Sequence, residues 1–193
     1  MKPFDVLLYG LVVLGWSSSW LPLKWQGGEI APEVSLVWRF YLAGALMFLL
    51  GFVTKRRLRL PLWGHGVAVS LGVFLFSTNF ALFYYASAFL ASGLLAVVFA
   101  SASLINLFYG AAVFRTPITW IGLLASLLGF SGILMLYWPE ISVSRAALGA
   151  LALCLGGTLC FCTGNMISSA AQKRDLPVVG STAWAMIYGA TYM

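Results

Sequence analysis

Long runs of apolar residues, separated by short polar connections, make up most of this sequence. A helix that crosses a bilayer needs roughly 20 mostly apolar residues, and six runs meet this requirement. A seventh run begins at Pro177 and continues to Met193. Proline and glycine residues fall in the connections, where helices are expected to start and stop. The predicted spans cover residues 4–24, 32–54, 62–86, 92–114, 118–137, 146–171 and 177–193.

The composition indicates that lipid is the solvent for much of the surface. Hydrophobic residues make up 62% of the chain and charged residues only 8%, whereas a soluble domain carries roughly 25% charged residues. The net charge of +6 does not indicate nucleic-acid binding, because the basic residues lie in short connections between apolar runs. The sequence therefore predicts an all-α polytopic membrane helix bundle.

The basic residues are distributed unequally between the two sides of the predicted bundle. Eight lie on the side of the N-terminus and two on the other side, while Arg39 falls within the second span. Because lysine and arginine accumulate on the cytoplasmic side, this bias predicts a cytoplasmic N-terminus in a bacterial inner membrane. The eight residues are Lys2, Lys55, Arg56, Arg57, Arg59, Arg115, Lys173 and Arg174.

The chain also begins to repeat itself. A shift of 145 positions carries Pro32 onto Pro177 and Gly44 onto Gly189. Five spans precede the second copy, and an odd number means that this copy enters the membrane from the opposite side. We therefore predict a first repeat of five helices over residues 1–140 and the start of an inverted second repeat over residues 141–193, with two helices of which the last is incomplete.

Several segments resemble the EamA-type transporters of the drug/metabolite transporter superfamily. These segments are residues 15–19 with Lys24, residues 38–40, residues 79–86, and residues 116–122 leading to 129–132. The resemblance implies ten helices in two inverted five-helix repeats, so about seven of the ten spans would be present and the second repeat would be truncated. Family members often have a proline in the first half of the fourth helix, where this chain has Phe99-Ala100-Ser101-Ala102-Ser103.

Polar and aromatic residues within the spans are the candidates for a substrate pathway, because a polar side chain facing lipid is costly. Asn79 and Phe83 share a helical stripe that we expect to include Phe76. Alternatively, such polar residues only bond to a neighbouring helix, at about 0.6 kcal/mol each. The predicted substrate-binding residues are Trp16, Ser19, Asn79, Phe83, Ser103, Asn106 and Asn165.

Charged residues within the spans narrow the class of substrate. All five acidic residues lie at helix ends or in connections, and proton-coupled pumps for cationic drugs typically use an acid inside the membrane. We therefore expect a neutral, zwitterionic or weakly anionic metabolite, such as an amino acid. Arg39 either anchors its helix at the outer interface, which we favour, or holds an anionic group.

The sequence contains no pattern that indicates an enzyme, a cofactor or a metal site. The three cysteines, Cys154, Cys160 and Cys162, share one apolar run without a histidine or carboxylate, so we interpret them as packing residues. The fifth span carries a seam of small residues that favours close helix contact and would suit a homodimer. The seam is formed by Gly122, Ala125, Gly129 and Gly132.

These observations favour a carrier that moves a small metabolite across the inner membrane, as an exporter working by alternating access. The alternative is a membrane scaffold or assembly subunit that transports nothing, and an inactive truncated carrier belongs with this alternative. An intramembrane enzyme ranks lowest, because no catalytic pair falls within the spans.

Overall fold

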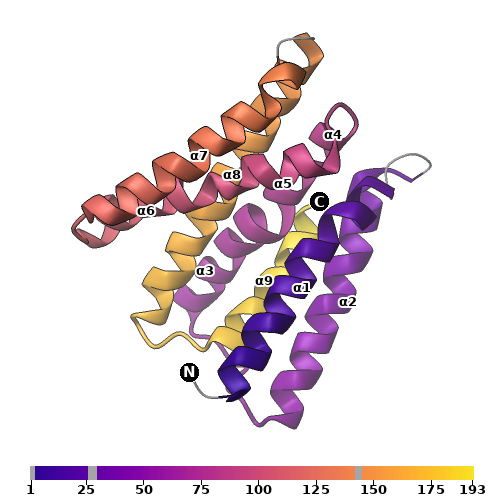
Figure 1. Ribbon diagram of the computed structural model, residues 1–193. Coiled ribbons are helices and arrows are strands. Elements are labelled where there is room, and N and C mark those ends of the chain that lie inside the picture. The colour runs from indigo at the N-terminus through magenta and orange to yellow at the C-terminus, as the bar shows by residue number, and fades with distance from the viewer. Residues whose placement is uncertain (1–2, 26–29, 142–144) are drawn as a thin grey trace.

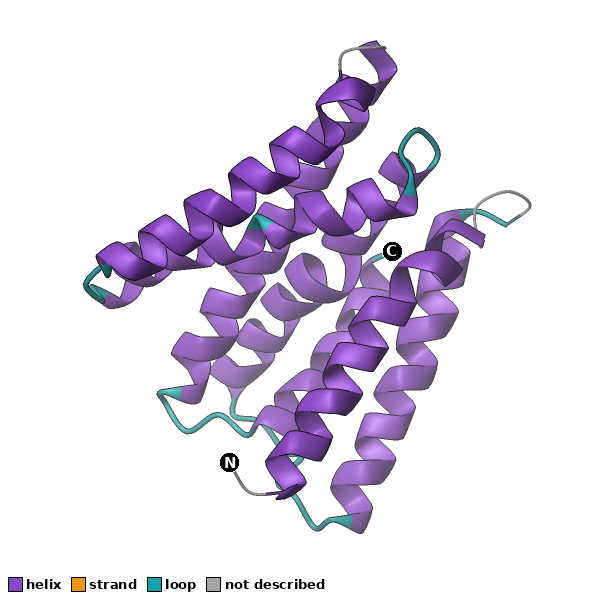
Figure 2. Cartoon of the chain, in the orientation of Figure 1, coloured by secondary structure: helices purple, strands orange, loops and turns teal. Residues whose placement is uncertain are grey.

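The computed structural model of the chain describes residues 3–25, 30–141 and 145–193. Within these ranges the chain is helical, with short connections and no strand (Figure 2). The helices pack side by side as a bundle, which confirms the predicted fold class. Side chains of Lys2, Lys24, Glu29, Glu140 and Arg145 lie outside the described residues, so the charges predicted there are not placed.

The helices follow the predicted spans closely. Two of the spans are each divided into shorter segments, the third by a π-helix and the fourth by a single turn residue. The elements are α1 (Pro3–Trp25), α2 (Pro32–Val53), α3 (Leu62–Val73), η1 (Phe74–Thr78), α4 (Asn79–Ser87), α5 (Ser92–Ala100), α6 (Ala102–Phe114), α7 (Trp120–Ile141), α8 (Arg145–Gln172) and α9 (Val178–Tyr192).

The fourth span breaks at Ser101 although it contains no proline. The hydroxyl and the amide of Ser101 both donate to the carbonyl oxygen of Val98, at 2.6 and 3.0 Å. Serine competes in this way with the regular helix bonds. The thiol of Cys162 in α8 donates to the carbonyl oxygen of Ala102, at 3.6 Å. The helix is thus interrupted at Ser101, in the segment where the resemblance leads us to expect a proline.

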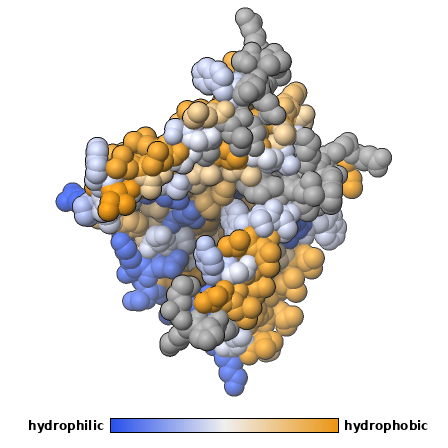
Figure 3. Space-filling view, viewed as in Figure 1, coloured by the Kyte–Doolittle hydropathy of each residue, from blue (hydrophilic) through white to orange (hydrophobic). Residues whose placement is uncertain are grey.

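The surface of the bundle suits a lipid environment. Four continuous helical segments of the described chain are long and apolar enough to cross a membrane: residues 32–53, 62–87, 92–114 and 148–172. Large apolar side chains face outward; Leu62, for example, is 92% exposed and Ile121 81%. Figure 3 shows such apolar patches over much of the visible face, with hydrophilic residues gathered toward one end. The protein is therefore a multi-pass membrane protein.

Helix α9 lies between α2 and α3 and packs on both (Figure 1). Its contacts with α2 run in opposite directions along the two helices. They pair Tyr41 with Thr191, Phe48 with Trp184, and Gly51 with Val179. Helices α2 and α9 are therefore antiparallel.

Helices α3 and α9 approach each other most closely at two glycines. A Cβ atom built on Gly72 would lie 2.7 Å from the amide nitrogen of Gly189 and 2.8 Å from the carbonyl oxygen of Ala185. A Cβ atom on Gly189 would lie 2.8 Å from the carbonyl oxygen of Gly72. Small residues allow membrane helices to pack backbone against backbone. This crossing fixes α9 against α3.

The connections that carry the basic residues gather at one end of the bundle. Figure 1 shows the connections α2–α3 and α8–α9 at the lower end and α6–α7 at the left edge, away from α4–α5. Lys55, Arg115 and Asp175 each adopt a left-handed backbone just after a helix, with φ of 53°, 52° and 58°. Glycine usually occupies such positions. Two of them carry a cation instead, which interacts favourably with the negative end of the helix dipole.

The small-residue seam predicted on the fifth span makes no close helix contact around its later members. A Cβ atom built on Gly129 or Gly132 would have no neighbour within 4 Å, and Ala125 is exposed. Gly122 lies near Thr119 of the preceding connection and Leu107 of α6. In contrast, Gly72 and Gly189 bring the backbones of α3 and α9 together.

We expect Gly72→Ala to destabilise the bundle by about 1–3 kcal/mol, because the added methyl group meets backbone atoms that cannot move aside. Gly66→Ala is the matched control, since a Cβ atom there has open space in the same helix. It should be neutral or stabilising by up to about 1 kcal/mol. The free energy of unfolding of purified protein in mixed micelles measures both. Equal free energies of unfolding for the two variants would contradict the close backbone contact between α3 and α9.

Candidate functional site

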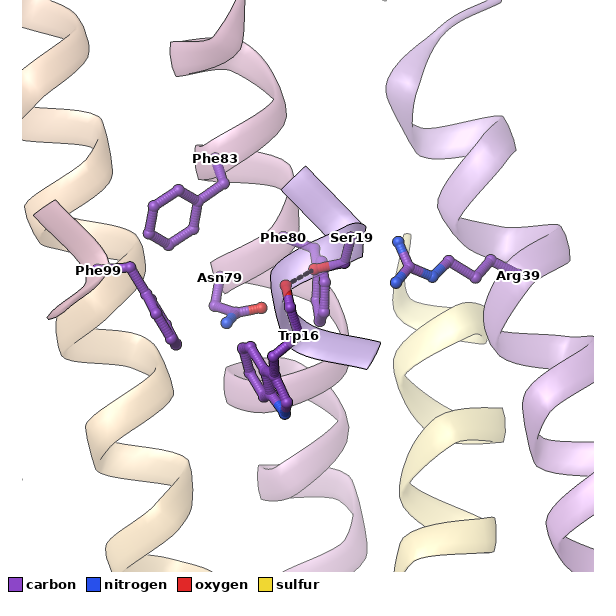
Figure 4. Close-up of a pocket in the computed structure, with 7 residues that line it drawn as sticks. All are labelled: Trp16, Ser19, Arg39, Asn79, Phe80, Phe83 and Phe99. Atoms are coloured by element: carbon purple, nitrogen blue, oxygen red, sulfur yellow. Dashed lines mark hydrogen bonds between the residues drawn. The ribbon is translucent and has the colours of Figure 1, made fainter. Parts of the chain in front are cut away.

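A cavity opens between α1, α2, α4 and α5. Its enclosed part has a volume of about 30 Å³, enough for one or two water molecules. An adjoining, more open part of about 340 Å³ shares four of the lining residues. Figure 4 shows the side chains around the enclosed part. They belong to Trp16, Ser19, Arg39, Asn79, Phe80, Phe83 and Phe99.

Aromatic rings form one wall of the cavity. The ring of Phe99 stacks on Trp16 with centroids 5.3 Å apart and meets Phe83 edge to face at 5.7 Å. Phe161 of α8 packs against Phe99 and Trp16, with ring centroids 4.7 Å and 5.7 Å away, respectively. Such contacts hold rings in defined orientations and offer flat apolar surfaces to a ligand. The cluster joins α1, α4, α5 and α8 around the cavity.

Asn79 is the buried polar residue of the cavity lining. Its side chain is 4% exposed, and its carbonyl oxygen has no hydrogen-bond partner among the described residues. An unpaired buried acceptor costs roughly 1–3 kcal/mol, and most buried polar groups in proteins are paired. In Figure 4 the side chain lies between Phe99 and Phe80, with its oxygen directed toward Phe80. Asn79 therefore places a buried, unpaired acceptor in the cavity lining.

The π-helix η1 determines which residues of the third span face the cavity. A π-helical turn is wider than an α-turn, so it shifts the faces of the helix that follows. Asn79 and Phe83 share the cavity face as predicted, but Phe76 does not. Phe76 packs on Phe40 instead, with ring centroids 5.5 Å apart, and approaches Gly189. The prediction for Phe76 was wrong because it assumed an uninterrupted α-helix.

Arg39 points toward the cavity from α2 (Figure 4). Its guanidinium carbon lies 5.1 Å from the ring centroid of Phe80 and 5.8 Å from that of Phe40, within cation–π range. Within the described part of the chain, Arg39 makes no ion pair. Glu33 of the same helix accepts a hydrogen bond from Tyr85 of α4. Arg39 thus lines the cavity while its side chain remains exposed, and the interfacial anchoring that we favoured stays a prediction.

Ser19 faces the cavity with its hydroxyl committed to its own helix. The hydroxyl donates to the carbonyl oxygen of Trp16 at 2.8 Å, a bond that Figure 4 marks. Its oxygen lone pairs remain available as acceptors. Ser17 and Ser18 bond back to α1 in the same way. Ser19 therefore contributes polar surface to the cavity rather than a free donor.

The structure brings together four of the seven sequence-predicted site residues, namely Trp16, Ser19, Asn79 and Phe83. The other three line neither part of the cavity. Ser103 is exposed and donates to the carbonyl oxygen of Ala100, and Asn165 is half-buried. Asn106 is half-buried, and its side-chain carbonyl oxygen lacks a partner within the described residues.

Sequence reasoning missed two aromatic residues of the lining, Phe80 and Phe99. Both lie in segments that the sequence singled out, and Phe99 lies one turn before Ser103, which could have marked it. His65, near the start of α3, is half-buried: its Nδ1 is 2.8 Å from the hydroxyl of Tyr188, and its ring packs on Trp184.

The cysteines lie away from the cavity lining. Cys154 and Cys162 are fully buried in α8, and all three cysteines are free. Histidines, cysteines and carboxylates of the described residues form no group of three that could hold a metal ion. The cavity lining thus offers hydrogen bonds, one cation and aromatic surface, which suit binding of a solute.

Comparison with known proteins places these features in a family. Residues 4–138 match the EamA-like transporter family. An uncharacterized transporter of Buchnera aphidicola subsp. Schizaphis graminum is 27% identical over 100 residues, which cover 52% of this chain and 33% of the relative. Protein PagO of Salmonella typhimurium is 27% identical over 95 residues, which cover 49% of this chain and 31% of PagO. No solved structure matches significantly.

The matched segments span about a third of the length of these two relatives. The family match itself covers most of this chain and includes every residue of the cavity lining. On this match, together with the bundle of membrane helices, the chain belongs to the EamA-like transporter family.

Proposed function

We propose that the protein carries a small metabolite across the bacterial inner membrane and that the Trp16–Asn79 cavity is its substrate site. The observation that carries this proposal is the buried, unpartnered carbonyl oxygen of Asn79 in an aromatic-walled cavity. Ligand sites are typically apolar pockets with a few convergent polar groups, as here. The direction that we propose is export, by alternating access between the two sides.

Two features of the packing support the proposal of an inverted repeat. The shift of 145 positions relates α2 to α9, and an inversion requires equivalent helices to run antiparallel, as these two do. The same shift carries Trp16 onto Phe161, and these two rings meet at 5.7 Å beside the cavity. Equivalent residues meet in this way near a pseudo-twofold axis. The cavity would then lie between the two repeats, where carriers bind substrate.

The proposed orientation places the connections α2–α3, α6–α7 and α8–α9 in the cytoplasm. These connections and their flanks carry most of the lysines and arginines. The cavity lies toward the opposite end, because Arg39 is only seven residues from the start of α2 at Pro32. We further propose that two copies pair through the exposed seam of α7, which includes Gly129 and Gly132.

We expect a cysteine at position 174 to react with a membrane-impermeant maleimide only after cells are permeabilised, and a cysteine at position 88 to react in intact cells. Arg174 and Ala88 are both exposed, in connections at opposite ends of the bundle. The variants Arg174→Cys and Ala88→Cys require a background without the three native cysteines. The reverse labelling pattern would overturn the proposed orientation.

We expect Asn79→Leu to abolish transport while leaving the fold intact. Because the carbonyl oxygen has no internal partner, an apolar side chain of similar size should change the free energy of unfolding by less than about 1 kcal/mol or raise it. If Asn79 served only to join helices, its loss would destabilise the protein instead. Uptake of a panel of amino acids and other metabolites into liposomes measures transport, and unfolding in micelles measures stability.

Asn106→Leu is the matched control for that experiment. Its carbonyl oxygen also lacks a partner, but the residue lines neither part of the cavity. It should transport as the wild type does. If it loses transport equally, the pathway extends along α6, as the sequence proposed for Ser103 and Asn106. A stable wild type that moves no solute would favour the alternative of a membrane scaffold.

A further inference from the structure

We propose that Arg39 selects substrates that carry a carboxylate, with the remainder of the substrate lying against the aromatic wall. This inference rests on the proposed function, because it takes the cavity as the substrate site. It narrows the expected class of substrate, which the sequence leaves as neutral, zwitterionic or weakly anionic. Arg39 would bind the anionic group, and Asn79 would accept a hydrogen bond from a donor on the same molecule.

The position of the guanidinium supports this assignment. Its carbon lies over the ring of Phe80, at 5.1 Å from the centroid. The N–H donors of a guanidinium point outward in its plane, which leaves them free to bind a carboxylate in a bidentate manner. Figure 4 shows the guanidinium directed toward Ser19 and Phe80. The guanidinium of Arg39 therefore contacts Phe80 through a cation–π interaction and keeps its N–H donors for a ligand.

The charges around Arg39 point to an anion. Among the described residues, no carboxylate lines either part of the cavity. The nearest acid along α2, Glu33, accepts a hydrogen bond from Tyr85. A cation within a membrane span is costly and normally faces a partner, a water-filled cavity or the functional pathway. A carboxylate that enters the cavity would supply the missing counter-charge.

The rest of the lining defines what accompanies the carboxylate. Trp16, Phe83 and Phe99 form an apolar surface next to Asn79. Flat or branched apolar groups fit such a surface, and a small donor that reaches the buried oxygen of Asn79 would pair it. The open part, of about 340 Å³, lies in the range of volumes that bind small organic molecules. Trp16, Ser19, Arg39 and Phe80 line both parts, so the bulk of a ligand would lie against Trp16 and Phe80 and only a small group would reach the part beside Asn79. The expected substrate is thus an amphipathic monocarboxylate.

Binding of two matched probes tests the role of Arg39. The probes are 3-phenylpropanoate and its neutral amide, 3-phenylpropanamide, which share an apolar body and differ in charge. Equilibrium dialysis against purified protein in nanodiscs at pH 7 should show the acid binding roughly 10- to 100-fold more tightly, as a charge-assisted hydrogen bond implies. Arg39→Gln should remove this preference, and Arg39→Lys should retain part of it.

Arg174→Gln is the control, because it removes the same charge from an exposed connection outside the cavity. It should bind both probes as the wild type does. Equal binding of acid and amide to the wild type, a preference that survives in Arg39→Gln, or failure of the acid to bind would each overturn the inference. If Arg39→Gln binds the amide normally, its loss of acid binding cannot reflect misfolding.

The outcome is separable from that of the proposed function. Protein that prefers the acid but moves no solute into liposomes would support the carboxylate site and contradict the carrier. Protein that transports solutes but binds acid and amide equally would support the carrier and overturn the role assigned to Arg39.

Discussion

The backbone contact between Gly72 and Gly189 is the constraint on which the rest of the bundle depends. In a bilayer, apolar side chains gain little by leaving lipid for protein, so helices associate through close packing and interhelical bonds. Two glycines allow α3 and α9 to meet without an intervening side chain, and α9 in turn packs along α2. These three helices form a fixed unit. The third span continues from this unit through η1 into α4, which carries Asn79 and Phe83 into the cavity.

The cavity combines groups that are costly to keep in a membrane. Arg39 is charged and lacks an ion pair in the described structure, while the carbonyl oxygen of Asn79 is buried and unpaired. Apolar residues at both positions would be more stable in a membrane, because hydrocarbon supplies neither a counter-charge nor a hydrogen bond. Their joint presence beside Trp16 and Phe99 is the basis of the proposed substrate site.

Much of the fold could be predicted from the sequence, because apolar run length and the positions of proline and glycine set the ends of each span. The cavity was only partly predictable. Asn79 and Phe83 lie one α-turn apart and were placed together correctly, whereas the π-helix turned Phe76 away from them. Helical periodicity cannot reveal a local insertion of this kind. Likewise, small residues marked α7 for close packing, but only the three-dimensional arrangement shows that Gly72 meets Gly189.

The central claim is that solute moves through the cavity beside Ser19, and chemical modification of that position tests it most directly. In a background without the native cysteines, Ser19→Cys should react with a membrane-impermeant maleimide added from the side opposite the N-terminus. The bulky adduct should then stop uptake of whichever solute the unmodified protein carries. Complete modification of the cysteine with unchanged uptake would show that the cavity is not the pathway.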